Sequence, residues 1–486
     1  SRVLKPMVKQ DLEKIASGVK LGMTLFEPKG DFADDVARMC EKMGIPCTYV
    51  NPLREDTAVL NPLEGDAYSV AESVRTVLRS IFGKQEAFFA HVQETAARNV
   101  ILMLKELRGD DLTLLDVVRA LRDQKVLKNL VQDLERQIGS SDLVDYFRAE
   151  VLGELREKFY QFAMGLRQQL EDISGNPLLK RVLIGKSSID LDGHLDKGGH
   201  VLLVNTAMGE LGHLGDVFGQ FLIMHFQNAV FRRPGTEWTR TPHILYIDEF
   251  PRYINPDFER LLAIGRSFRC ACVLALQALS QLKLEGNPHF VDVVLNNARN
   301  WVVFGGLSAE EAKRFEKEFG ADRVDRVSRT YNGVPVIPGL QVPERSSVSE
   351  SWEARFDFTY IKELPARYVI YRIVRDGSVQ PPALGVTSRI DEKGVSVNIF
   401  QALFKREGSR AAPESGLAVE ESPGENVARK LWPEKDLFAG TLQEGSEKAA
   451  DAAGQENILE RQGTADSPVV STGDGDAFFG GLKLPG

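Results

Sequence analysis

Two stretches of this 486-residue chain alternate short apolar runs with segments of helical spacing. In residues 1–64, apolar runs at 21–26 and 46–50 alternate with helical patterns at 6–17 and 34–42. In residues 191–404, apolar runs recur at 200–205, 243–248, 270–276, 301–304 and 368–372. Strands that alternate with helices usually pair in parallel, because each crossover lays a helix over the sheet. The sequence therefore predicts an α/β core with a mostly parallel sheet.

The two α/β stretches are separated by a block of a different kind. In residues 65–190 apolar side chains recur at helical spacing, as in Val70, Val74, Val77 and Ile81, with almost no strand pattern. We expect an inserted all-helical domain here.

The C-terminal segment differs from both. Residues 405–486 are rich in Gly, Glu, Ala and Ser and carry 15 acidic and 9 basic side chains, a net charge of −6. Such a composition predicts an acidic, disordered tail. The total of −9 leaves −3 for the body, which neither favours nor excludes nucleic-acid binding.

Composition excludes two other classes. No window approaches the roughly 18 uncharged apolar residues of a membrane-spanning helix. The four cysteines, Cys40, Cys47, Cys270 and Cys272, do not have the spacing of a zinc site.

The strongest local motif is an apolar run, Ile244 to Ile247, that ends in Asp248 and Glu249. Phosphates and Mg²⁺ bind at the carboxyl ends of the strands in an open α/β sheet. There Asp248 would hold a water of the metal, and Glu249 would activate the attacking water. The alternative is a strand that ends in two solvated acids.

A second polar strand end supports the nucleotide interpretation. The next apolar run is followed by Gln277, whose amide could sense a γ-phosphate; the alternative is an ordinary polar strand end. Together these features predict a sheet that hydrolyses ATP with Mg²⁺.

The glycine-rich phosphate loop of such enzymes is not found in the sequence. Gly185-Lys186-Ser187 fails because Lys180 stands where the motif requires glycine, and Gly83-Lys84 is followed by Gln85.

The order of the motifs resembles that of the conjugative coupling ATPases of type IV secretion, the TraG/TraD type of the HerA/FtsK superfamily. The resemblance covers roughly residues 1–390 and replaces the family's usual first Asp by Glu27. It is carried by Glu27-Pro28-Lys29-Gly30-Asp31, Asn51-Pro52, Asp248-Glu249-Phe250, Gly265-Arg266 and Gln277 with Ser280-Gln281-Leu282.

The resemblance implies a RecA-like P-loop NTPase core and several further roles. The phosphate loop would lie upstream of Ser1, whose hydroxyl would contact Mg²⁺, so the chain alone would be inactive. Glu27 and Lys29 would approach the nucleotide, although Lys29 could instead only shape its turn. Arg266 or Arg299 would act as an arginine finger in trans, the alternative being an ordinary surface arginine.

The function implied is an ATP-driven DNA translocase that delivers single- or double-stranded DNA, or a protein–DNA complex, to a secretion channel. Its partners would be relaxosome and channel proteins. It would be a homohexamer whose cytoplasmic domain is anchored in the bacterial inner membrane. The alternatives are a cytosolic DNA pump of the same superfamily and a non-enzymatic scaffold with a degenerate nucleotide fold.

Overall fold

The computed structural model describes residues 3–82, 87–154, 156–255, 257–282, 287–331, 343–387, 389–390 and 396–397. The chain divides into two units, residues 1–409 and 410–486, and every described residue lies in the first. Ser1 and the acidic tail predicted over residues 405–486 lie outside the described residues. None of the described helices is both long and apolar enough to span a bilayer.

A five-stranded, fully parallel sheet forms the core, in the order β2-β3-β1-β4-β5. This confirms the α/β prediction. The strands are β1 (Gly22–Glu27), β2 (Cys47–Val50), β3 (Val201–Asn205), β4 (His243–Ile247) and β5 (Cys270–Leu274).

Helices cover both faces of this sheet. Both sets of side chains along a strand are therefore buried, which explains why the strands are mostly apolar instead of alternating between apolar and polar residues. On one face, Met23 and Leu25 of β1 pack with Val8 and Leu12 of helix α1 (Leu4–Ala16) and with helix α2 (Asp31–Met43). On the other face, Phe26 packs in the cluster that contains helix α12 (His213–Arg232). The side chains of β1 therefore belong to two separate apolar clusters, one on each face of the sheet.

Between β2 and β3 the described residues include helices and their connections but no strand. Asn228 of α12 donates to Ser73 of α3 at 2.7 Å, which joins this block to the sheet-covering helix. The boundaries 65–190 of an inserted domain stay a prediction. The helices are α3 (Ala67–Phe82), α4 (Ala87–Arg108), α5 (Leu114–Arg122), α6 (Gln124–Ile138), α7 (Asp142–Tyr146), α8 (Arg156–Gly175), α9 (Pro177–Leu183) and α10 (Leu191–Lys197), with short helices η1 (Gly109–Asp111) and η2 (Phe147–Val151).

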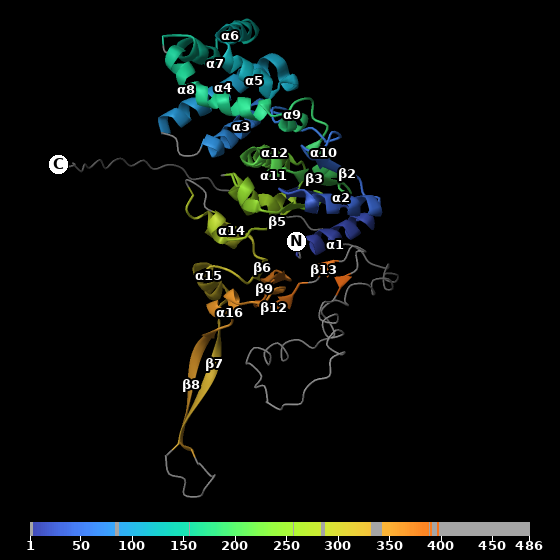
Figure 1. Cartoon of the computed structure of the whole chain (residues 1–486), viewed down its shortest axis with the longest axis vertical. Helices are drawn as coiled ribbons and strands as arrows, with labels where there is room; N and C mark the ends of the chain where they lie inside the picture. Colours follow the sequence, from blue (N-terminus) through green and yellow to red (C-terminus); the bar gives the residue numbers. More distant parts are fainter. Residues whose placement is uncertain are drawn as a thin grey trace, which may run out of the picture. The chain divides into compact units, whose positions relative to one another are not determined.

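The runs at 301–304 and 368–372 form a separate antiparallel sheet, β12-β9-β6, rather than extending the parallel sheet. The chain between β6 and β9 contains a long two-stranded ribbon, β7-β8, which the sequence patterns did not indicate (Figure 1). The strands are β6 (Trp301–Phe304), β7 (Ala321–Tyr331), β8 (Pro343–Ala354), β9 (Tyr368–Arg372) and β12 (Ala383–Val386), with two-residue strands β10 (Val374–Arg375), β11 (Ser378–Val379), β13 (Arg389–Ile390) and β14 (Ser396–Val397).

The remaining helices connect these strands. They are α11 (Met208–Leu211), η3 (Phe250–Tyr253), α13 (Phe258–Ile264), η4 (Gly265–Phe268), η5 (Leu279–Leu282), α14 (Phe290–Asn297), α15 (Ala309–Phe319) and α16 (Phe358–Lys362).

A buried histidine network crosses the amino-terminal half of the parallel sheet. Thr24 Oγ1 lies 2.9 Å from Nε2 of both His194 and His243, and His194 Nδ1 lies 2.9 Å from His200 Nδ1. Burial, with a smaller effect from His200, lowers the pKa of His194 to about 3. Burial also lowers the pKa of His200 and, well below its ordinary value, that of His243. These imidazoles are therefore neutral in the folded protein.

We expect the protein to lose stability between pH 6.5 and 5. The unfolded chain takes up protons at a pKa of about 6.5, whereas the buried histidines do not, so their contribution is complete above that pH and falls below it. Each such histidine contributes a slope of about 1.4 kcal/mol per pH unit to the free energy of unfolding. Urea denaturation at several pH values measures the slope.

The slope should decrease in His194→Gln. His91→Gln is the control, because His91 is exposed and lies outside this network. A wild-type stability that is constant from pH 7.5 to 5 would contradict this account.

Candidate nucleotide site at the carboxyl edge of the sheet

The carboxyl ends of β1 and β4 meet at one edge of the sheet. Phe26 pairs with Ile247 in parallel register, and the Asp248 N–H donates to the Phe26 carbonyl at 2.9 Å. Glu27, the last residue of β1, and Asp248, the first after β4, are consequently neighbours. The register of two strands thus joins residues that are 221 positions apart, since 248 − 27 = 221.

Both carboxyls are held in an environment that disfavours their charge. Burial raises the pKa of Glu27, against the backbone N–H groups of Lys29 and Gly30, and the charge of Asp248 adds to the increase. Burial, followed by the charge of Glu249, raises the pKa of Asp248. A cation bound beside these two groups would relieve both effects.

Glu249 is fixed beside Asp248 by its backbone and by two polar neighbours. It adopts the left-handed conformation, with φ of 54°, which is uncommon for a residue other than glycine. Its Oε1 accepts a hydrogen bond from Gln277 Nε2 at 2.8 Å, and Lys29 Nζ lies 3.9 Å from the same oxygen. The structure therefore brings together Glu249, Gln277 and Lys29, three of the residues singled out in the sequence.

Gln277 is itself held by a residue that sequence reasoning gave no separate role. Gln281 Oε1 accepts the backbone N–H groups of Gln277 at 3.2 Å and Ala278 at 3.1 Å. This closes the turn after β5 and aims the Gln277 amide at Glu249. The only sequence signal was the position of Gln281 within the Ser-Gln-Leu motif.

A cavity of about 470 Å³ opens beside these groups. Lys29, Glu249, Gln277 and Gln281 line one of its walls. Its other wall comes from α12 and η3, where Arg252 Nη1 lies 3.2 Å from both carboxylate oxygens of Asp216. The sequence pattern gives no sign of this wall, because the residues of α12 show only the pattern of an apolar helix. Its further lining residues are Met208, His213, Gln220 and Pro251.

The carboxylates at this edge of the sheet fit an Mg²⁺ ion whose other ligands are phosphate and water. No cluster of three or more His, Cys, Asp or Glu side chains suited to a metal occurs in the part of the chain that the structure describes. Mg²⁺ does not need such a cluster, because it commonly binds one or two carboxylates and keeps several waters. Asp248 and Glu27 are the carboxylates that could serve it.

The two arginines considered as fingers lie elsewhere. Arg266 precedes β5, at the amino edge of the sheet, about 16 Å from the carboxyl edge for a five-residue strand. It pairs there with Glu237 at 3.2 Å. Arg299 is exposed just before β6. Neither lines the cavity beside Glu249, so a role for either in trans stays a prediction.

The comparisons with known proteins agree with this architecture. Residues 242–355, from the Asp248 strand to the end of the ribbon, match the family model described as the TraM recognition site of TraD and TraG. No curated protein matches the chain significantly in sequence.

Solved structures of one protein share the fold. The bacterial conjugative coupling protein TrwBdeltaN70, in its unbound monoclinic form, aligns with a TM-score of 0.54 at 15% identity, over 79% of this chain and 82% of that one. The plasmid coupling protein TrwB in complex with the non-hydrolysable ATP analogue ADPNP aligns with a TM-score of 0.50 at 14% identity, over 79% and 87%. The chain resembles the conjugative coupling ATPases. The family resemblance and the P-loop NTPase fold class that the motifs indicated are thereby confirmed.

The turn after Glu27 requires glycine at position 30. Its φ is +97°, its N–H donates to Glu27, and a Cβ added there would lie 2.6 Å from Asn205 Nδ2. Asn205 is in turn held by its Oδ1, which accepts the Ala207 N–H at 2.8 Å. Glycine is therefore required by both backbone conformation and space.

We expect Gly30→Ala to lower the free energy of unfolding by about 1–3 kcal/mol, the usual cost of a forced left-handed residue. Chemical denaturation measures the change. Gly209→Ala is the matched control, because nothing lies within 4 Å of a Cβ at Gly209 and its φ is not positive. Equal stability of the two variants would contradict the role given to Gly30.

Proposed function

We propose that this chain is the motor part of a coupling protein, an ATP-driven translocase that delivers DNA or a protein–DNA complex to a type IV secretion channel. The observation that carries the proposal is the hydrogen bond of 2.8 Å between Gln277 and Glu249, directly beside Asp248. A carboxylate that can take a proton and an amide that can contact a phosphate meet at the carboxyl edge of a parallel sheet.

Each residue has a distinct chemical part in this proposal. ATP with Mg²⁺ would supply the phosphoryl group and neutralise its charge. Asp248 would hold a water of the metal, and Glu249 would accept the proton of the attacking water. Gln277 would exchange its bond to Glu249 for one to the γ-phosphate. Glu27 holds the turn that presents Lys29 to the cavity, through the Lys29 N–H at 2.8 Å.

The wider assembly belongs to the same proposal. TrwB, which shares this fold, has been solved with an ATP analogue, which supports nucleotide binding at this sheet. The match to a TraM recognition site supports a relaxosome protein as a partner. We further propose a homohexamer with Arg266 or Arg299 acting across the subunit boundary, anchored at the bacterial inner membrane.

Replacing Glu249 by Gln in the intact protein should abolish ATP turnover, by at least about a hundredfold, because the amide cannot accept the proton. Nucleotide binding should persist, since Glu249 does not carry the metal in this scheme. Phosphate release and binding of a fluorescent ATP analogue measure the two quantities. Glu41→Gln is the control, because Glu41 is exposed near the end of α2, does not line the cavity, and should leave turnover unchanged.

Unchanged turnover in Glu249→Gln would refute the assignment of the base. Absence of turnover and of nucleotide binding in the intact wild-type protein would favour the scaffold alternative.

A further inference from the structure

Trp238 is the most exposed large apolar side chain among the described residues, at 83%. It lies in the turn between α12 and β4, at the amino edge of the parallel sheet. Its indole buries almost no surface in this chain, so apolar burial does not explain its position. The hydrogen bonds and the charged side chains around the turn indicate instead what the indole can bind.

The turn that carries Trp238 is closed on itself. The Thr236 N–H donates to Thr239 Oγ1 at 2.8 Å, and the Thr239 N–H donates to the Thr236 carbonyl at 3.1 Å. Gly235 has φ of +87°, and a Cβ there would lie 2.6 Å from Thr239 Oγ1. Trp238 therefore stands at the apex of a defined turn rather than on an open loop.

A buried arginine anchors the start of this turn. Arg233 is 3% exposed and donates to the carbonyls of Leu195 at 2.9 Å and of Phe268 and Thr241 at 2.6 Å. These hydrogen bonds connect the end of α12 to α10 and to the residues just before β4 and β5. Fixing a turn in advance lowers the entropy that is lost when a ligand binds to it.

Two further arginines hold the turn from its other side. Arg240 donates to the Ser267 carbonyl at 2.6 Å, and its guanidinium packs 4.5 Å from the centre of the Phe268 ring. Arg269, in the left-handed conformation at φ of 51°, donates to the Trp238 carbonyl at 3.4 Å. Within the described part of the chain, no carboxylate lies within ion-pair distance of Arg240 or Arg269. Their positive charge is consequently uncompensated.

Arg266 adds a third guanidinium at the surface. Its side chain is 88% exposed and pairs with Glu237 at 3.2 Å. An ion pair with one partner so exposed stabilises a protein little, so Arg266 can exchange it for another anion. Trp238 is thus surrounded by cationic side chains, although the chain as a whole is acidic.

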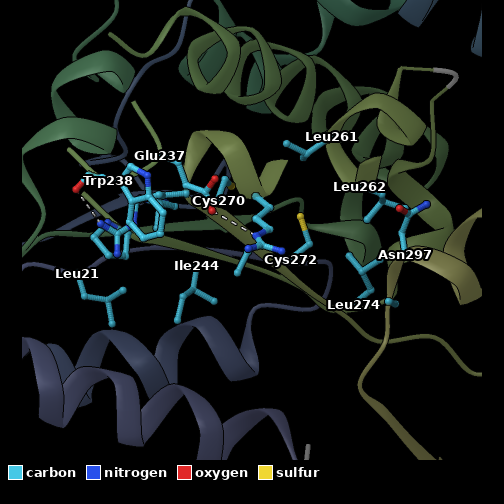
Figure 2. Close-up of a pocket in the computed structure, with 16 residues that line it drawn as sticks. Leu21, Glu237, Trp238, Ile244, Leu261, Leu262, Cys270, Cys272, Leu274 and Asn297 are labelled. Atoms are coloured by element: carbon cyan, nitrogen blue, oxygen red, sulfur yellow. Dashed lines mark hydrogen bonds and ion pairs between the residues drawn. The ribbon is translucent and has the colours of Figure 1, made fainter. Parts of the chain in front are cut away.

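A cavity of about 540 Å³ adjoins the indole and runs along the outer edge of β5. Figure 2 shows Trp238 at one end of this cavity and Leu274 and Asn297 at the other. Its walls are largely apolar, with Leu261 and Cys272 among them. Arg266 and Arg269 line the same cavity, so a base stacked on the indole would have guanidinium groups beside it.

We propose that Trp238 and the arginines around it form a binding surface for single-stranded nucleic acid. One base stacks on the indole, and Arg266 and Arg269 face the backbone phosphates, which leaves Arg299 as the candidate for the finger in trans. Aromatic platforms beside cationic grooves bind single strands in this way, and the bases of a duplex are not free to stack on them. The uncompensated arginine charge favours a nucleic acid over an apolar protein segment. The inference rests on the proposed function, since it names the surface that contacts the DNA.

The test uses the full chain without nucleotide and a fluorescein-labelled oligothymidylate of about 20 nucleotides, longer than one binding site of about 4–16 nucleotides. Trp238→Ala should weaken binding about 5- to 150-fold, the effect of losing one stacked base, and Trp238→Phe should restore most of it. A duplex of the same length should bind more weakly. Fluorescence anisotropy measures the affinities.

Trp352 provides the matched control, because it is 74% exposed on the β7-β8 ribbon, away from this turn. Trp352→Ala should bind as the wild type does. Arg266→Gln should reduce the slope of log affinity against log salt by about 0.7, the value for one phosphate contact on a single strand.

The outcomes separate this inference from the proposed function. Wild-type binding that survives Trp238→Ala, or that Trp352→Ala weakens equally, overturns the surface and leaves a DNA pump possible. Failure of the wild-type chain to bind either DNA overturns both the surface and DNA as the substrate.

Discussion

The parallel pairing of β1 between β3 and β4 is the constraint on which the candidate site depends. Glu27 pairs with Asn205 and Phe26 pairs with Ile247, so the three strands end within one residue of the same level. Backbone hydrogen bonds continue past the strand ends, from the Thr206 N–H to the Glu27 carbonyl at 3.1 Å and from the Asp248 N–H to the Phe26 carbonyl at 2.9 Å. A shift by one residue would reverse the faces of the side chains and separate the acidic groups.

This arrangement concentrates negative charge in a partly buried place. Water cannot fully solvate Glu27 and Asp248. Burial raises the pKa of both carboxyls, and the charge of Asp248 adds to the increase at Glu27. The protein offsets part of this cost with the N–H groups of the Lys29 turn, the Lys29 ammonium and the Gln277 amide. What remains is an edge suited to a divalent cation and a polyphosphate, because these supply opposite charge and further ligands together.

The two ends of the sheet use polar groups in opposite ways. At the amino end, burial keeps the linked histidines His194, His200 and His243 neutral, so they bridge strands and helix without carrying charge. Beyond them, arginines bond to backbone carbonyls and keep their charge at the surface around Trp238. One sheet thereby separates an anionic edge, which suits a metal-bound nucleotide, from a cationic turn, which suits a phosphate backbone.

The sequence by itself determined the class of fold and the acidic strand end. Apolar runs alternating with helical patterns suffice to predict a parallel sheet, and Asp248-Glu249 after such a run indicates its carboxyl edge. Only the tertiary structure decided which strands are neighbours, and therefore that Glu27 lies by Asp248 and Gln277 by Glu249. It also decided that 301–304 and 368–372 form a separate antiparallel sheet, and that Asp216, Arg252 and Gln281 surround the cavity. The physical reason is that strand periodicity is local, whereas strand order and the packing of α12 arise from contacts between residues far apart in the chain.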